Sequence, residues 1–298
     1  MKNLEDFLKP TQAELFKLLC KKFHGKAVGS EGSFILVKGN APVMLLAHLD
    51  TVHAEPVKEI CATPDGNILM SPQGIGGDDR CGVYALNKIY NQAEIKPYLL
   101  FTCDEEIGGV GARQFRLAHS AGLLPAELKS LKLLIEIDRK GKKDAVYYDC
   151  DNPAFEKYIS SKGFKTAHGS FSDISVVAPE LGVAAVNLSS GYYNAHTLHE
   201  YINRKHLERT ISKVAEIISD AAQKNFQQFK YIPRQHIGYT FEIADDVPKN
   251  LPKDYEEIYM ALLDNYSQNE LEEYRNLYGN EILRDLCRQE FGVQFDNL

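Results

Sequence analysis

An apolar run that ends in a histidine and a carboxylate constrains this chain more than any other stretch. Residues 43–47 are all apolar and are typical of a buried strand, and His48 and Asp50 follow directly. In open α/β sheets, ligands bind outside the carboxyl ends of the strands. A buried strand that leads into two such polar groups therefore indicates a functional site rather than a core position.

Four further segments carry side chains of the same kind, and two of these also follow apolar runs, at residues 98–102 and 131–137. Imidazole and carboxylate groups suit a pair of zinc ions, and a carboxylate left over suits a general base. The four segments are Gly-Gly-Asp-Asp-Arg at 76–80, Thr-Cys-Asp-Glu-Glu at 102–106, Ile-Glu-Ile-Asp at 135–138 and Asn-Ala-His-Thr-Leu-His-Glu at 194–200.

These motifs, in this order over residues 41–202, resemble those of the di-zinc exopeptidase superfamily. That superfamily contains peptidase T, the glutamate carboxypeptidases, succinyl-diaminopimelate desuccinylase and the single-domain zinc aminopeptidases. Residues 48–52 resemble its His-x-Asp-Thr-Val motif, and residues 77–82 contain its Asp-Asp-Lys/Arg-x-Gly motif. Residues 104–106 resemble its paired glutamates, and residues 196–200 its closing His-x-x-x-Glu.

The resemblance implies a complete set of ligands for two zinc ions, with cobalt or manganese as alternatives. Asp78 matches the position that bridges the two ions in the superfamily. His48 and Asp138 would complete one zinc site, and Glu106 and His196 would complete the other.

Further roles follow from the same resemblance. Asp50 would hydrogen-bond the far nitrogen of His48 and fix its tautomer, as metal-bound histidines usually require. Glu105 would be the general base that accepts a proton from water and returns it to the leaving amine. Tyr192, Tyr193 and Asp173 are candidate substrate-binding residues, although packing roles fit the two tyrosines equally well.

The order of apolar and amphipathic segments predicts an α/β fold. Strands and helices alternate, so we expect a mostly parallel mixed sheet flanked by helices on both faces. A further helical segment over residues 4–23 is interrupted by Pro10. The predicted strands are 34–38, 43–47, 98–102, 131–137 and 183–188, and the predicted helices are 79–91, 112–119, 154–162 and 204–226.

Segment lengths predict a catalytic core without a lid. Many relatives carry a lid domain between the third metal carboxylate and the last histidine, whereas here residues 139–195 are all needed for the core. Residues 53–74 have room only for a hairpin. We expect a catalytic domain over residues 1–225 and a helical C-terminal appendage over 226–298, packed on the core, with helical patterns at 254–263 and 270–291.

Net charge and sequence pattern argue against several kinds of partner. The net charge of −7 argues against nucleic acid as a partner, because phosphate binding needs a basic surface. No stretch reaches the length of a membrane span, and acidic residues interrupt the start where a signal peptide would be apolar, so we expect a cytoplasmic protein that does not bind membranes. The six cysteines are scattered without a Cys-x-x-Cys pair, so we expect reduced thiols rather than disulfides.

The function that these observations favour is a zinc-dependent metallopeptidase, most simply an aminopeptidase that hydrolyses short peptides. An amidohydrolase that removes the acyl group from an N-acyl amino acid would use the same chemistry. A non-catalytic binding or scaffolding protein of the same fold is a third hypothesis, disfavoured by the complete ligand set and by Glu105. The expected substrate is thus a small peptide or an N-acyl amino acid, and a homo-oligomer is compatible with all three hypotheses.

Overall fold

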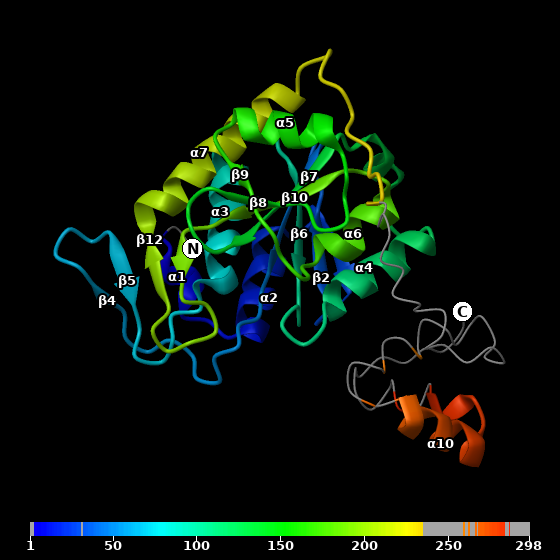
Figure 1. Cartoon of the computed structure of the whole chain (residues 1–298). Helices are drawn as coiled ribbons and strands as arrows, with labels where there is room; N and C mark the ends of the chain where they lie inside the picture. Colours follow the sequence, from blue (N-terminus) through cyan, green and yellow to red (C-terminus); the bar gives the residue numbers. More distant parts are fainter. Residues whose placement is uncertain are drawn as a thin grey trace. The chain divides into compact units, whose positions relative to one another are not determined.

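The computed structural model describes residues 3–30, 32–234 and 268–283, together with Tyr259, Leu262, Tyr266 and Leu286. By its contacts the chain divides into two compact units, Met1–Arg234 and Gln235–Leu298 (Figure 1). All the segments with metal-type motifs belong to the first unit.

An eight-stranded mixed sheet forms the centre of the first unit, in the order β1-β2-β6-β3-β7-β10-β8-β9. The pairs β3/β6, β3/β7, β7/β10 and β8/β9 are parallel, and the antiparallel pairs lie toward the two edges. The predicted mixed α/β sheet is confirmed. Its strands are β1 (Ala27–Ser30), β2 (Phe34–Val37), β3 (Val43–His48), β6 (Tyr98–Thr102), β7 (Leu133–Arg139), β8 (Asp144–Val146), β9 (Lys165–Thr166) and β10 (Ala185–Ser189).

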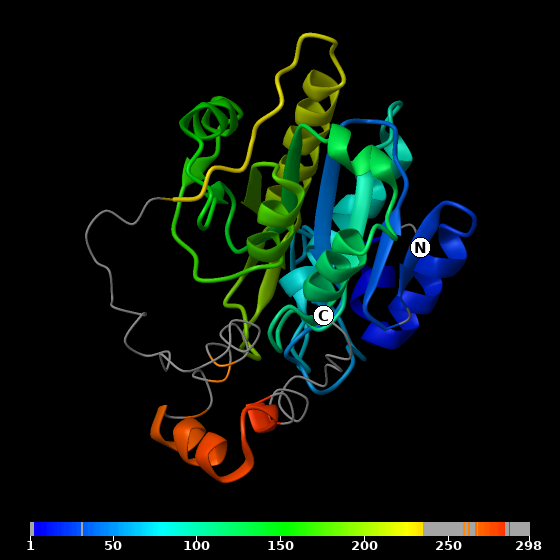
Figure 2. The same ribbon diagram turned by 90° about the vertical axis from the view of Figure 1, so that its right-hand side faces the viewer.

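Helices cover both faces of this sheet (Figures 1 and 2). Successive strand residues point to opposite faces, so β2 sends Ile35 and Val37 into one core cluster and Phe34 and Leu36 into the other. The first cluster includes α1 (Glu5–Leu8), α2 (Gln12–Lys22), α3 (Gly77–Gln92), α5 (Pro153–Ser161) and α7 (Arg204–Ala221), and the second includes α4 (Val110–Ser120), the 3-10 turn Ala126–Ser130 and α6 (Ile174–Leu181).

The N-terminal helical segment is split at Pro10, as predicted. Thr11 begins α2 with a capping box: its hydroxyl oxygen accepts the Glu14 backbone N–H, while the Glu14 carboxylate accepts the Thr11 backbone N–H. The connection between α1 and α2 is therefore fixed by local hydrogen bonds.

A second, four-stranded sheet was not predicted as such. The expected hairpin between residues 53 and 74 forms, but its second strand also pairs with a segment that follows the last motif. The order is β11 (Tyr192–Tyr193), β12 (Tyr201–Asn203), β5 (Ile68–Met70) and β4 (Cys61–Ala62). Because β11 and β12 flank residues 194–200, this small sheet holds the loop that carries His196.

No lid is inserted between the third acidic motif and the last histidine. Residues 139–195 form β8, α5, β9, α6 and β10, which belong to the central sheet or pack on it, and then β11. Sequence analysis missed α6, and its Pro179 and short length explain why periodicity did not reveal it.

The second unit contains α10 (Gln268–Tyr278), which overlaps the first part of the predicted helical pattern at 270–291. Its buried side chains include Tyr259, Leu262, Leu271 and Leu283. Apart from Tyr259 and Leu262, the predicted helix over 254–263 lies outside the described residues. Among the helices that the structure describes, none combines the length and apolar character needed to cross a membrane.

Candidate metal centre

The motifs gather at the carboxyl ends of the central parallel strands. His48 ends β3 and pairs in register with Thr102, the last residue of β6, so the loop with Glu105 and Glu106 begins beside it. Asp138 lies near the end of the neighbouring strand β7, and Asp78 lies at the start of α3. The strand ends therefore bring together side chains that are up to 90 positions apart in the sequence.

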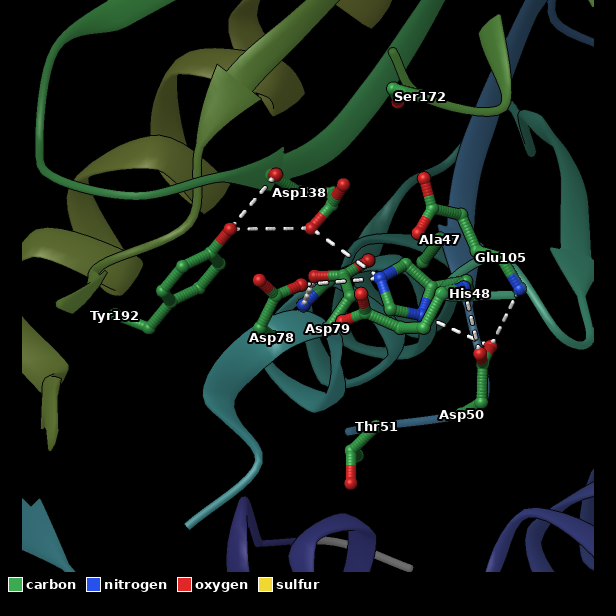
Figure 3. A network of polar contacts seen from close by, with 12 residues as sticks. Ala47, His48, Asp50, Thr51, Asp78, Asp79, Glu105, Asp138, Ser172 and Tyr192 are labelled. Carbon is green, nitrogen blue, oxygen red and sulfur yellow. Dashed lines mark hydrogen bonds and ion pairs between the residues drawn. The ribbon is translucent and has the colours of Figure 1, made fainter. Parts of the chain in front are cut away.

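The first half of the centre consists of His48, Asp78 and Asp138, all buried (Figure 3). His48 Nε2 lies 3.2 Å from Asp78 Oδ1 and 3.6 Å from Asp138 Oδ1. Burial alone would lower the pKa of His48, but its hydrogen bonds to the surrounding carboxylates raise that pKa well above its usual value. In a protein without bound cations, the imidazolium thus supplies the positive charge that these carboxylates need.

The second half is built on the other oxygen of Asp78. His196 Nε2 lies 3.3 Å from Asp78 Oδ2 and 3.2 Å from Glu106 Oε1. His196 has a left-handed backbone, with φ of 62°, which is uncommon for a residue other than glycine and marks a constrained position. Asp78 thus lies between the two histidines, with one oxygen toward each.

Asp50 ties the first histidine to the paired glutamates. Its Oδ1 lies 3.2 Å from His48 Nδ1 and accepts the backbone N–H of Glu105 at 3.1 Å, while its Oδ2 accepts that of Glu106 at 3.0 Å (Figure 3). A single carboxylate therefore orients the His48 ring and the backbone of both glutamates.

Glu105 lies beside both halves of the centre. One of its oxygens is within 4.8 Å of ligand atoms of His48 and Glu106. Burial raises the pKa of Glu105 to about 9, and the nearby carboxylates, Asp138 first among them, act in the same direction. A cation bound at the centre would favour the ionised form, which is the form that a general base requires.

Glu200 fixes the backbone of the Asp78 loop. It is fully buried; its Oε1 accepts the Asp78 backbone N–H at 2.9 Å, and its Oε2 accepts that of Gly76 at 3.0 Å and lies 2.8 Å from His53 Nε2. At Gly77 a Cβ atom would lie 2.7 Å from the Tyr192 Cβ, so only glycine allows this close approach. The peptide bond after Asp78 is cis.

Asp138 is held by two residues from neighbouring segments. The Asn187 side-chain oxygen accepts the Asp138 backbone N–H at 2.9 Å, and the Tyr192 hydroxyl donates to the Asp138 carbonyl oxygen at 3.1 Å. Asn187 was missed by sequence analysis, although a lone amide within the apolar run 183–188 is the signal that could have identified it.

Tyr193 and Asp173, the other two candidate substrate-binding residues, do not contact the proposed ligands in the way that Tyr192 does. The Tyr193 hydroxyl is 2.8 Å from His206 Nδ1 at the start of α7, and its ring stacks on Tyr201 of β12, so these contacts lie outside the centre. Asp173 is buried and accepts a hydrogen bond from the Thr102 hydroxyl. Tyr192 is the member of the three candidates that contacts a proposed ligand.

The donor atoms fit a pair of divalent metal ions. His48, Asp78 and Asp138 offer ligand atoms that all lie within 4.8 Å of one another, and so do Asp78, Glu106 and His196. Imidazole nitrogens and carboxylate oxygens are ligands that zinc accepts. The pKa of Asp138 is raised well above its usual value by burial and by the neighbouring carboxylates, a crowding of like charges that cations would relieve.

Comparison with solved structures identifies the fold. A tripeptidase from Staphylococcus aureus aligns with a TM-score of 0.56 and 16% identity over 74% of this chain and 96% of its own. The aminopeptidase PepT from Bacillus cereus aligns with a TM-score of 0.54 and 15% identity, over 74% and 99%.

The chain has the fold of these exopeptidases. The TET1 peptidase of Pyrococcus horikoshii, which assembles into a tetrahedron or a large octahedral shell, is similar at a TM-score of 0.53 and 13% identity, over 72% of this chain and 98% of its own. Neither a protein-family model nor a curated protein sequence matches the chain. The structural similarity thus confirms the fold implied by the sequence motifs. The sequence identities are too low to transfer an activity, which must be argued from the site itself.

Proposed function

We propose that this protein is a metal-dependent aminopeptidase that hydrolyses short peptides. The observation that carries the proposal is the position of Asp78, whose two carboxylate oxygens each lie 3.2–3.3 Å from the nitrogen of a different histidine. Structural likeness to a tripeptidase and an aminopeptidase supports the same reaction class.

The proposed ligands are His48 and Asp138 on one side, Glu106 and His196 on the other, and Asp78 between them. Two zinc ions held there would lower the pKa of a water molecule and polarise the carbonyl of the scissile peptide bond. Cobalt or manganese would suit the same nitrogen and oxygen donors.

The remaining residues of the centre position groups and move the proton. Asp50 holds the His48 ring and the backbone of the paired glutamates. In the part of the chain that the structure describes, no residue hydrogen-bonds the Glu105 carboxylate, so this group is free to accept a proton from water and to deliver it to the leaving amine. Tyr192 and Asn187 keep Asp138 in place.

A free N-terminal amine is the substrate feature that this architecture favours. Carboxylates around the centre are suited to hold a cationic amine, whereas residues 139–195 supply no lid to grip other parts of a substrate. The N-acyl amino acid amidohydrolase remains the second candidate, because the same centre would cleave an acyl amide bond.

A hydrolysis screen tests the proposal directly. Purified protein loaded with zinc, cobalt or manganese is incubated with Leu-Gly-Gly, with the same peptide acetylated at its N-terminus and with N-acetyl-leucine. We expect cleavage of the free peptide alone. Cleavage of the blocked substrates alone favours the deacylase, and no hydrolysis with any metal favours the non-catalytic scaffold.

Assembly and location are part of the same proposal. A homo-oligomer is compatible with the TET1 peptidase, which has this fold and forms closed shells. The predicted cytoplasmic location, and the predicted absence of nucleic-acid and membrane partners, stay as predictions. Light scattering of the purified chain measures the oligomeric state.

A further inference from the structure

A cavity of about 570 Å³ adjoins the candidate metal centre. Its walls come from residues 50–57, the loop 74–76, the connection between α1 and α2, and Glu106 with Ile107. This volume lies within the roughly 300–1,000 Å³ that small-molecule sites occupy. Because Asp50 and Glu106 belong both to the cavity wall and to the centre, a molecule in the cavity would extend toward the proposed metal ions.

Arg80 lines the same cavity and has unused hydrogen-bond donors. Its side chain is 4% exposed, and its Nη1 donates to the carbonyl oxygens of Phe7 at 3.0 Å and Pro10 at 2.8 Å. Its buried Nε has no partner, and neither Nε nor Nη2 bonds any residue that the structure describes. Nε has almost no accessible surface, so Nη2 is the donor that an incoming acceptor would use.

Four carboxylates lie on the cavity wall. Three of them already accept hydrogen bonds from protein donors, and the fourth, Glu106, is a proposed metal ligand. Within the described chain, Arg80 makes no ion pair at contact distance, although the charges of Asp50 and Asp79 act on it from farther away. The partners of the wall carboxylates are the backbone N–H groups of Glu105 and Glu106 for Asp50, the Gln12 amide for Asp104 at 2.8 Å, and the Lys58 ammonium for Glu55 at 2.6 Å.

We propose that Arg80 binds the C-terminal carboxylate of a short peptide whose scissile bond lies at the metal centre. The inference rests on the proposed peptidase function and specifies its substrate as a peptide with a free carboxyl end. The Arg80 Nη2 carries unused N–H groups on a cationic group, which suit a charge-assisted hydrogen bond to a carboxylate oxygen. Apolar side chains of the wall, such as Val52, Val57 and Ile107, would pack on the residues between.

The same arrangement limits substrate length. Arg80 is anchored to the carbonyl oxygens of Phe7 and Pro10, and the connection between α1 and α2 lines the same cavity. The chain's own N-terminal segment therefore takes the place that a lid has in gripping a substrate carboxylate. A longer peptide would have no free carboxylate at this depth of the cavity.

The first experiment uses the unmodified protein and needs no variant. The specificity constant kcat/KM is measured for Leu-Gly-Gly as the free acid and as the C-terminal amide. We expect the amide to be cleaved with a kcat/KM lower by about tenfold or more, mainly through a higher KM, because a charge-assisted hydrogen bond is lost. Equal values for acid and amide overturn the inference but leave the peptidase function intact.

The second experiment removes the guanidinium. Arg80→Met should bring the ratio of kcat/KM for the free acid to that for the amide close to one, and Arg80→Lys should restore part of the preference. Arg209→Met is the matched control, since Arg209 also donates to two carbonyl oxygens but lies outside the cavity wall. A variant that retains the full acid preference shows that the carboxylate binds elsewhere.

A third set of substrates separates the inference from the proposed function. N-acetyl-leucine also carries a free carboxylate, so its cleavage together with an Arg80-dependent KM would assign the carboxylate to an N-acyl amino acid and overturn the peptide assignment. If no peptide is cleaved at all, the proposed function fails. If Arg80→Met does not fold, the comparison of acid and amide on the unmodified protein still decides the question.

Discussion

Glu200 Oε1 accepts the backbone N–H of Asp78 at 2.9 Å, so a residue four positions after His196 fixes the carboxylate that faces both histidines. The second oxygen of Glu200 holds Gly76 and contacts His53. Three segments of the centre are therefore joined through one buried side chain. The closing His-x-x-x-Glu motif supplies a candidate ligand, His196, and four residues later Glu200, which orients a second candidate ligand, Asp78.

Glu200→Gln should weaken metal binding without removing a ligand. An amide presents an N–H₂ group to one of the two backbone N–H donors, so the Asp78 loop shifts and the metal affinity falls by about 10- to 100-fold. Zinc titration of the metal-free protein against a chelating indicator measures this loss.

Glu208→Gln serves as the control, because Glu208 pairs with Lys88 at the surface. Unchanged zinc affinity in folded Glu200→Gln would show that Glu200 supports only the fold. A lowered melting temperature with normal zinc affinity would lead to the same conclusion.

Glu105→Gln should separate chemistry from metal binding. The substitution keeps the size of the side chain but removes its ability to accept a proton, so kcat should fall by about a hundredfold or more. Metal analysis of the same sample should find as much bound zinc as in the unmodified protein. If activity is unchanged, Glu105 is not the base, and if metal is lost, Glu105 belongs among the ligands.

The central strands and the proposed ligands were predictable because both are encoded locally. The runs that became β3, β6 and β7 are mostly apolar on both faces, as strands buried between two layers of helices are, although β7 also contains the buried Glu136. Site residues lie at the end of each strand or just after it. Once those strands are neighbours in a parallel sheet, His48, Glu106 and Asp138 must meet at one edge. The spacing along the chain therefore predicted proximity in space.

Contacts between distant segments were not predictable in this way. The strands β4, β5, β11 and β12 have only two or three residues each, too few to show a period, and the pairing of β5 with β12 is set by tertiary packing. The contacts of Arg80 were not predictable either. The motif places Arg80 at the start of a helix, but its side chain contacts carbonyl groups 70 and 73 positions away.

Removal of single ligands should reveal the number of metal ions. His48→Ala and His196→Ala should each lose one of two ions, because each histidine contacts a different oxygen of Asp78. Asp78→Ala should lose both. Elemental analysis of zinc-loaded, desalted protein measures the ratio of metal to chain.

A ratio near one in the unmodified protein would reduce the centre to a single ion. Retention of two ions by Asp78→Ala would show that Asp78 does not bridge them. His206→Ala is the matched control, since His206 contacts Tyr193 outside the centre and should leave the metal content unchanged.

The stability of the metal-free protein should fall as the pH rises. The pKa of Glu105 is raised from 4.5 to about 9 by burial, so its contribution to stability is complete below pH 4.5 and is lost as the pH rises through about 9. The pKa of His196 is raised to about 9, chiefly by its hydrogen bond to Asp78, so its contribution is complete below 6.5 and is lost over the upper part of the same window. The ionisation of Glu105 and the deprotonation of His196 therefore both lower the stability of the metal-free protein as the pH rises from 4.5 to 9.

Bound zinc should reverse this trend, because it takes the place of the protons among the carboxylates and imidazoles. Thermal melting with a chelator and with excess zinc, at about pH 5.5 and about pH 8, measures the difference. We expect the increase in Tm on adding zinc to be larger at the higher pH, and the chelated protein to melt at a lower temperature there. In chelated Glu105→Gln, which cannot ionise at this position, the decline of Tm with pH should be smaller. Zinc binding requires these carboxylates to lose their protons, which is easier at the higher pH. An equal increase in Tm on adding zinc at both pH values would therefore contradict the view that zinc binds to these crowded, protonated carboxylates.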